Sequence, residues 1–375
     1  MTGSGGDVAA GMAANVIAAA FGGPDLLTVI EEPAAEPGPG QARIAVRAAG
    51  VNPVDHKAYS GAFGADPDRL PVRPGLEAAG VVSAVGPEAA GPAGPVAAGV
   101  NPVDYKAYSG AFGADPSRLP VRPGQEAAGV VSAVGPDAAG PAGPVAIGDE
   151  VIAYRAPGAY ATELVVAAAA LVPKPGALDW AQAACLMVTG VTAWHLLAAT
   201  DVHEGDTVLI HGGAGGVGLM ALQLAAGRGA TPVVTASPSK HGFLRDLGAL
   251  PVAYGPGLAG RVRAEVPGGV DAALDLIGTD EALDVSLELV ADRARIATIA
   301  GFARGFQEGI KVLGGAPGAD PGTQIREAAR LELTRLAQDR ALRVFVTQTF
   351  PLAKAADAHR AIMTGHATGK IALIP

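Results

Sequence analysis

The stretch Thr207–Gly218, Thr-Val-Leu-Ile-His-Gly-Gly-Ala-Gly-Gly-Val-Gly, constrains the fold of this chain more than any other. An apolar run of strand character leads into a glycine turn and then into an apolar helix. Gly213, Gly215 and Gly218 give the spacing G-x-G-x-x-G between strand and helix, which is typical of dinucleotide-binding βαβ units. These glycines permit a tight turn, a close approach of backbone to a pyrophosphate, and close packing of helix on strand. The alternative is a glycine-rich turn that binds nothing.

Strands and helices alternate after this turn. Strands are expected at 231–236, 250–253, 270–276 and 295–300, with helices at 238–247, 258–266 and 280–290 between them, and 310–313 as a final strand. This rhythm predicts an α/β domain with a doubly wound parallel sheet of the Rossmann type. The predicted phosphate-binding residues of the turn are Gly213, Ala214, Gly215, Gly216, Val217 and Gly218.

The end of the second strand of this domain favours NADPH over NADH. An acidic residue about 20 positions after the glycine turn would bind the ribose 2′-hydroxyl of NAD. Here the strand ends in Ser237-Pro238-Ser239-Lys240, without Asp or Glu. Two hydroxyls and a cation suit a 2′-phosphate, so Ser237, Ser239 and Lys240 are assigned to it. The alternative is a Ser-Pro helix start in which Ser237 is only the N-cap.

Three further residues are assigned to the cofactor site. Tyr254 follows the third strand, Gly301 follows the strand at 295–300, and Thr192 lies in the helical stretch 180–200. An aromatic residue near a strand end is more often a packing residue, so this alternative stays open for Tyr254. The stretch 180–200 has helical spacing in two segments, with a break expected at Thr189-Gly190.

The chain contains a tandem repeat. Val51–Gly99 recurs as Val100–Gly148, and the copies differ only at His56/Tyr105, Asp68/Ser117, Leu76/Gln125, Glu88/Asp137 and Ala98/Ile147. Repeat folds normally diverge and need three or more units to stack, so this is either a recent duplication or a cloning artefact. One domain needs only one such segment, and we expect the other copy to be an insert or the two to compete for one place. The second copy is preferred for Gly124–Val131, because it continues directly into Gly148-Asp149.

The regions flanking the Rossmann domain predict a second, β-rich domain. Short strands separated by Pro/Gly turns precede it, including 43–46 and 148–154. After it come a helix at 325–337, a strand at 343–347, a helix at 354–363 and a strand at 371–374, which lack the doubly wound rhythm. The predicted organisation is a disordered leader at 1–11, a catalytic domain at 12–170 and 320–375, and a Rossmann domain at 171–319.

Each repeat copy carries the same candidate catalytic residues. Asn-Pro-Val-Asp-x-Lys follows a strand, which places Asn52 and Lys57, or their doubles Asn101 and Lys106, near the cofactor. Asn-Pro is also a turn signal, and the Asp could merely cap the next helix. Glu77 and its double Glu126 each precede Ala-Ala-Gly-Val-Val and are interpreted as structural.

Composition excludes several classes of function. The formal charge is −9 without a Lys/Arg cluster, so nucleic acid and anionic membranes are not expected partners. Cys185 is the only cysteine and the seven histidines are scattered, which predicts no disulfide and no metal site. The longest apolar run, 164–172, is too short for a bilayer, and no signal peptide is recognised. A reducing cytoplasm suits this composition.

Together these motifs resemble the zinc-free, quinone oxidoreductase-like (zeta-crystallin-like) branch of the medium-chain dehydrogenases/reductases. The resemblance runs from about Val16 to the C-terminus. It rests on V-N-P-V-D-x-K, P-G-x-E-A-A-G-V-V, G-D-E-V, the segment 158–163, Thr192-Ala193-Trp194, A-G-G-V-G and Gly369-Lys370-Ile371. Zinc-containing relatives carry G-H-E where this chain has Gly75-Leu76-Glu77 and Gly124-Gln125-Glu126, so the metal-binding His is absent.

The resemblance implies a GroES-like β-barrel domain split around the Rossmann domain, and often a homodimer. It also implies NADPH-dependent reduction of a small-molecule quinone or α,β-unsaturated carbonyl. Asn101 and Lys106, or Asn52 and Lys57, would stabilise charge on the substrate oxygen. Tyr108 or Tyr160 would deliver the proton, although water could do so equally well. The alternatives are an enoyl reductase of a biosynthetic pathway and a non-catalytic NADPH-binding sensor.

Overall fold

The computed structural model describes residues 11–18, 24–50, 77–79, 126–156, 158–365 and 367–375. The chain forms two compact units. Unit 1 comprises Met1–Val188 and Val346–Pro375, and unit 2 comprises Thr189–Phe345. Residues 1–10 of the predicted leader and most of both repeat copies lie outside the described residues, whereas Gly11 is described and its carbonyl accepts the Ala34 N–H at 2.9 Å.

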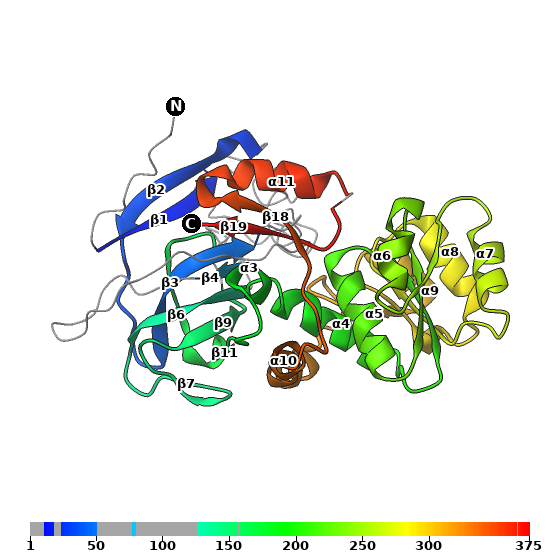
Figure 1. The fold of residues 1–375 in the computed structure, drawn as a ribbon, viewed down its shortest axis with the longest axis horizontal. Helices are drawn as coiled ribbons and strands as arrows, with labels where there is room; N and C mark the ends of the chain where they lie inside the picture. Colours follow the sequence, from blue (N-terminus) through cyan, green and yellow to red (C-terminus); the bar gives the residue numbers. More distant parts are fainter. Residues whose placement is uncertain (1–10, 19–23, 51–76, 80–125, 157, 366) are drawn as a thin grey trace. The chain divides into compact units, whose positions relative to one another are not determined.

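Unit 2 contains the predicted parallel sheet (Figure 1). Its spatial order is β14-β13-β12-β15-β16-β17, and every neighbouring pair is parallel. In chain order this is 3-2-1-4-5-6, the doubly wound order of dinucleotide-binding folds. The strands are β12 (Thr207–His211), β13 (Thr231–Thr235), β14 (Leu250–Val252), β15 (Ala272–Asp275), β16 (Ile296–Thr298) and β17 (Lys311–Val312).

Helices connect these strands and bury their apolar residues against the sheet. Leu209 and Val233 of the central strands form one core cluster with Val262 and Leu283 of the connecting helices. The helices are α5 (Gly216–Gly227), α6 (His241–Arg245), α7 (Leu258–Glu265), α8 (Asp280–Leu289) and α9 (Phe302–Glu308), with the short turns η5 (Pro238–Lys240) and η6 (Arg293–Arg295). The alternation predicted from the sequence is confirmed strand by strand.

Unit 1 is built on a mixed sheet with β3 (Gln41–Gly50) at its centre. The order along its main path is β11-β9-β6-β3-β19-β18, and β10 and β4 also pair with β3. The strands are β4 (Glu77–Ala79), β6 (Glu126–Val134), β9 (Glu150–Tyr154), β10 (Glu163–Ala167), β11 (Leu171–Pro173), β18 (Val346–Pro351) and β19 (Lys370–Ile374). β6 comes from the second repeat copy, as the sequence favoured.

Smaller elements complete unit 1. β1 (Met12–Ala18) and β2 (Leu27–Pro33) form an antiparallel pair, as do the two-residue strands β7 (Ala139–Gly140) and β8 (Gly143–Pro144). α11 (Ala355–Met363) lies beside β18 and β19, which it connects as a parallel crossover (Figure 1). The remaining turns are η1 (Pro24–Leu26), η4 (Ala168–Ala170) and η7 (Leu352–Lys354). Within the described ranges, no helix is long and apolar enough to cross a membrane.

The division into units differs from the boundaries expected at 170/171 and 319/320. α3 (Trp180–Ala183) contacts β3, β6, β18 and β19, and therefore belongs to unit 1. α10 (Thr323–Gln338) belongs to unit 2, where Arg326 Nε donates to His195 Nδ1 at 3.3 Å. The strand expected at 343–347 begins only at Val346. The backbone of Arg343 instead bonds to the side chain of Gln223 in α5: the Arg343 N–H donates to Gln223 Oε1 at 2.9 Å, and Gln223 Nε2 donates to Arg343 O at 3.1 Å.

The helix break expected at Thr189-Gly190 is wrong. The chain is interrupted between α3 and α4 (Met187–Ala199), and Gly190 lies inside α4. A Cβ at Gly190 would lie 3.0 Å from Leu333 Cδ1 of α10. Gly190 therefore serves the close packing of two helices, whereas its low helix propensity had indicated a break.

Candidate functional site

The carboxyl ends of the parallel strands in unit 2 form the candidate site. In open α/β sheets, ligands bind beyond these ends, where the strand order reverses direction. Here the reversal lies between β12 and β15, which are neighbours in the sheet although far apart in sequence. The glycine turn leaves β12 at this point, so it has the location that the sequence predicted.

Close contacts explain the glycines of the turn. A Cβ at Gly213 would lie 2.5 Å from Val234 Cβ, and one at Gly218 would lie 2.7 Å from Gly213 Cα. Neither position accepts a side chain without moving the backbone. The tight turn itself is made by Gly212, with φ at 81°, rather than by Gly213. Gly212 lies outside the G-x-G-x-x-G spacing, so the motif does not predict its role, and its being a glycine is the one signal in the sequence.

The start of α5 is suited to an anion. Gly215 is the N-cap and makes no side-chain cap hydrogen bond, so the first N–H groups of the helix keep their donor capacity. A Cβ at Gly215 would meet only Gly212 O, at 3.5 Å, so the backbone there is approachable. With the positive end of the helix dipole, this arrangement fits a pyrophosphate held by the N–H groups of Gly216, Val217 and Gly218, with Ala214 in the turn.

The predicted 2′-phosphate residues lie at the next strand end. Ser237 stands at the N-cap of η5, but its hydroxyl makes no cap bond and lies 3.3 Å from Ser239 Oγ. Lys240 ends η5; its backbone N–H donates to Ser237 O at 2.9 Å, and its ammonium group makes no hydrogen bond or ion pair with the residues that the structure describes. Ser237 and Lys240 are half-buried and Ser239 is exposed, so all three polar groups are accessible to a ligand.

Tyr254 lies in the loop after the neighbouring strand β14, with 54% of its surface exposed. Arg261 fixes this loop by donating from Nε to Ala253 O at 2.9 Å and from Nη2 to Gly255 O at 2.7 Å. No sequence motif predicts these contacts of the Arg261 guanidinium. The exposed ring on a fixed loop is available for contact with a ligand, which favours the assignment of Tyr254 to the site over a packing role.

The other two assigned cofactor residues differ in their surroundings. The Gly301 N–H donates to Thr298 Oγ1 at 2.9 Å, which places Gly301 at the carboxyl edge of the sheet. Thr192 is buried on α4, and among the described residues no hydrogen bond joins it to the glycine turn. The structure therefore brings Gly301 to the candidate site, while the role of Thr192 stays a prediction.

The predicted catalytic residues lie mainly outside the described residues. This applies to Asn52, Lys57, Asn101, Lys106 and Tyr108. Tyr160 is described, and it is buried in unit 1 with its hydroxyl 3.0 Å from His359 Nε2. The two rings also meet edge-to-face. A buried, hydrogen-bonded hydroxyl is typical of a packing residue, so a proton-donating role for Tyr160 stays a prediction.

Glu126 is a buried carboxyl group at the beginning of β6. It accepts a hydrogen bond from the Val188 N–H in the first turn of α4. Burial raises the pKa of Glu126 well above 4.5, although the charge of Lys370 and the Met187 N–H lower it. Its bonding to backbone agrees with the structural interpretation of the sequence, but its partner is a helix N-terminus rather than a turn.

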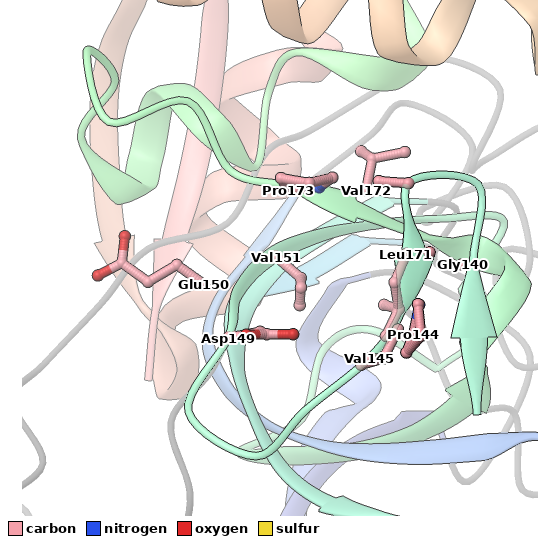
Figure 2. A pocket seen from close by; sticks show the side chains of 11 residues that line it. Gly140, Pro144, Val145, Asp149, Glu150, Val151, Leu171, Val172 and Pro173 are labelled. Carbon is pink, nitrogen blue, oxygen red and sulfur yellow. The ribbon is translucent and has the colours of Figure 1, made fainter. Parts of the chain in front are cut away.

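Unit 1 also contains a pocket. Figure 2 shows it between the starts of β9 and β11 and the β7–β8 pair, with Val151 and Leu171 among its lining side chains. None of those predicted cofactor or catalytic residues that the structure describes lines it. Among the described residues, no three His, Cys, Asp or Glu side chains gather as metal ligands.

Comparison with known proteins agrees with this architecture. The family model described as the GroES-like domain of alcohol dehydrogenase matches residues 38–94 and again 95–176, and a model described as zinc-binding dehydrogenase matches 247–373. The double match follows the tandem repeat. A quinone oxidoreductase of Pseudomonas aeruginosa is 30% identical over 382 residues, covering 97% of this chain and 100% of the relative.

Two further similarities extend this result. A 2-haloacrylate reductase of a Burkholderia species is 34% identical over 239 residues, covering 58% of this chain and 71% of the relative. The solved structure of a mycobacterial protein in complex with NADPH superposes with a TM-score of 0.71 at 26% identity, covering 97% of this chain and 100% of the other. The fold is thus a Rossmann domain combined with a GroES-like domain, and the chain belongs to the quinone oxidoreductase family of the medium-chain dehydrogenases/reductases.

Proposed function

We propose that this oxidoreductase uses NADPH to reduce a quinone or an α,β-unsaturated carbonyl compound without zinc. The observation that carries the proposal is the uncapped start of α5 beside Ser237, Ser239 and Lys240 at the carboxyl edge of the sheet. The NADPH complex of the mycobacterial relative and the activity named for the Burkholderia relative support it. When bound, NADPH supplies the hydride for the reduction.

The residues of this chain would bind and orient the cofactor. The N–H groups of Gly216, Val217 and Gly218 would hold the pyrophosphate, while Lys240 would pair with the 2′-phosphate. Asn101 and Lys106, or their doubles in the first copy, would stabilise the negative charge that develops on the substrate oxygen. Tyr108 or water would supply the proton that completes the reduction.

Zinc independence rests on the sequence. Leu76 and Gln125 stand where zinc-containing relatives have a metal-binding His, and Cys185, the only cysteine, is buried. Easily reduced C=C and quinone substrates are therefore favoured over simple alcohols. We also retain the homodimer and the cytoplasmic location as predictions.

The primary test is steady-state oxidation of NADPH, followed by its absorbance, against 1,4-quinones, enones and enoyl thioesters. Turnover of quinones or enones supports the proposal, and turnover restricted to enoyl thioesters favours the enoyl reductase. Binding of NADPH without turnover of any acceptor contradicts an enzymatic role. Enzyme treated with a chelator should keep its full activity.

The cofactor preference is tested by Lys240→Ala. Loss of a charge-assisted contact with the 2′-phosphate should raise the Kd for NADPH about tenfold or more and leave the Kd for NADH unchanged. Arg245→Ala, which removes an exposed cation on the adjacent α6, is the matched control. If Lys240→Ala raises the Kd for NADPH and the Kd for NADH equally, the 2′-phosphate assignment is wrong.

A further inference from the structure

A row of buried polar residues crosses the carboxyl edge of the parallel sheet. Thr235, His211, Asp275 and Thr298 are the last residues of β13, β12, β15 and β16. The strand register pairs His211 with both Thr235 and Asp275, and Asp275 with Thr298. All four are at most 1% exposed. Buried polar side chains are costly unless they are hydrogen-bonded, so this row requires an explanation.

The hydrogen bonds of the row show which segments it holds. Thr235 Oγ1 accepts the Gly212 N–H at 3.2 Å. Asp275 Oδ1 accepts the N–H groups of Ile277 at 3.1 Å and Gly278 at 2.8 Å. Thr298 Oγ1 accepts the N–H groups of Ala300 at 3.1 Å and Gly301 at 2.9 Å. Thr235, Asp275 and Thr298 therefore each fix the first residues of the loop that leaves their own strand or the adjacent one, whereas the buried Nε2 of the fourth member, His211, has no hydrogen-bond partner among the described residues.

Asp275 connects two of these loops. Its Oδ2 accepts a hydrogen bond from Thr298 Oγ1 at 2.6 Å, while its Oδ1 holds the loop after β15. Its neighbour in the row, His211, has its pKa lowered to about 4 by burial, against the opposing charge of Asp275. At neutral pH the imidazole is therefore uncharged, and Thr298 and the loop N–H groups are the hydrogen-bond donors to the carboxylate.

The loops held by Asp275 are closely packed against each other and against the glycine turn. A Cβ at Gly278 would lie 2.8 Å from Gly301 N, so the loops after β15 and β16 touch. A Cβ at Gly212 would lie 2.8 Å from Ile277 Cγ2, so the loop after β15 also touches the glycine turn. Movement of the Asp275 carboxylate would thus be transmitted to both of its loops and to the turn.

We propose that Asp275 is a positioning residue for the nicotinamide cofactor, acting through Thr298 to fix the loops 276–279 and 299–301 around the point where the strand order reverses. This inference rests on the proposed function, because it assumes that the cofactor occupies that edge. Loops that are already ordered in the free protein need no ordering upon binding, which increases affinity. The effect concerns binding geometry, and Asp275 itself touches no reacting atom.

The test compares two substitutions of Thr298. Thr298→Val removes the hydroxyl that joins Asp275 to the loop after β16, and Thr298→Ser keeps it. We expect the Kd for NADPH, measured by fluorescence titration, to rise about tenfold in Thr298→Val and to stay within about twofold in Thr298→Ser. Asp275→Asn should raise the Kd at least as much, and kcat at saturating NADPH should change less than the Kd in all three.

Hydrogen exchange in the free protein separates this inference from the proposed function. Peptides covering 276–301 should exchange faster in Thr298→Val than in the unsubstituted protein and Thr298→Ser. Equal Kd changes in the Val and Ser variants, or no change in either, would overturn the role of Asp275. If the unsubstituted protein does not bind NADPH, the proposed function fails, and the exchange rates alone then decide whether Asp275 orders the loops.

Discussion

The two units differ in how many chain segments can fill one position in their sheets. In unit 2 each strand is a distinct segment that follows the previous one through a connecting helix. In unit 1, β3 pairs with both repeat copies: with β6 from Ala42 to Val46, and with β4 from Ala48 to Gly50. β4 is Glu-Ala-Ala of the first copy, and β6 begins with the same three residues of the second.

The register shows that the two copies meet beside β3. β6 extends to Glu126, but its pairing with β3 stops at Gly129, while Glu126–Val130 continues to pair with β9. The part of β3 beyond Val46 is paired with β4, which also contacts β6 and β9. The second copy fills the longer stretch, and its strand β6 leads through the β7–β8 pair into its other neighbour, β9. Identical sequence therefore has different structure in one sheet.

Glu126→Ala should cause the largest loss of stability, and its comparison with Glu77→Ala tests the asymmetry between the copies. Removing a buried carboxyl group that accepts the Val188 N–H at the start of α4 should leave a cavity and an unpaired donor, and destabilise unit 1 by about 3 kcal/mol. Glu77→Ala, the same change in the first copy, should cost less than about 1 kcal/mol. Urea unfolding followed by Trp180 in unit 1, in a Trp194→Phe background, measures both.

A controlled deletion sharpens this prediction. Removing Val51–Gly99 leaves Glu126 and β6 intact, so the shortened chain should fold and retain activity. Suppose that Glu126→Ala alone lowers the stability of unit 1 only slightly, while the double substitution of Glu77 and Glu126 lowers it strongly. The two copies then exchange places, and the asymmetry described above is wrong.

Lowering the pH should reduce the stability of unit 2 through His211. It should not reduce the contribution of the buried Glu126 carboxyl to the stability of unit 1. His211 has a folded-state pKa of about 4, below its unfolded value, so its contribution is present above about pH 6.5 and lost as the pH falls toward 4. The loss amounts to about 3 kcal/mol. The raised pKa of Glu126 has the reverse sign, so its contribution to unit 1 is lost as the pH rises through that pKa.

Unfolding curves between pH 4 and 8 test this contrast. Trp194 reports on unit 2 in a Trp180→Phe background, and Trp180 reports on unit 1 in the reverse background. His211→Gln should flatten the acid limb of unit 2 only. An acid limb that survives this substitution would assign the sensitivity to other groups.

Gly218→Ala should disrupt the glycine turn, while a glycine in the same helix tolerates the same change. The added methyl group would lie 2.7 Å from Gly213 Cα, so the variant should lose about 2 kcal/mol of stability and bind NADPH more weakly. Gly227, in the last turn of α5, has nothing within 4 Å of its Cβ position. Gly227→Ala should stabilise unit 2 by up to about 1 kcal/mol. Similar losses of stability in Gly218→Ala and Gly227→Ala would contradict the steric explanation for Gly218, since Gly227 has open space at its Cβ position.

The smallest expected effects compare a helix cap in each unit. Asp179 forms a capping box at α3 in unit 1, where its Oδ1 accepts the Gln182 N–H at 2.8 Å and Gln182 Oε1 accepts the Asp179 N–H. Thr279 caps α8 in unit 2 through one longer bond of 3.3 Å to the Ala282 N–H. Asp179→Ala should cost about 1 kcal/mol and Thr279→Ala about half as much, measured by thermal unfolding. The reverse order would contradict the importance of the reciprocal bond.

Much of the candidate site was predictable because its signals are local. The spacing of Gly213, Gly215 and Gly218 and the absence of an acidic residue near Lys240 depend on residues close together in the chain. Arg261 and Asp275 could not be recognised in the same way. Arg261 acts on backbone carbonyls and Asp275 on loops that meet only when the strands are aligned, and neither contact has a sequence motif.

The sequence by itself determined the alternation of strands and helices in unit 2, the glycine turn, and the family to which the chain belongs. Only the tertiary structure decided which repeat copy supplies β6, that Gly190 packs against Leu333, and that α10 belongs to unit 2. The physical reason is that local patterns depend on backbone propensity and polarity, which are the same in two identical segments. The choice between such segments depends on partners that are distant in sequence, such as Val188 and Lys370 for Glu126.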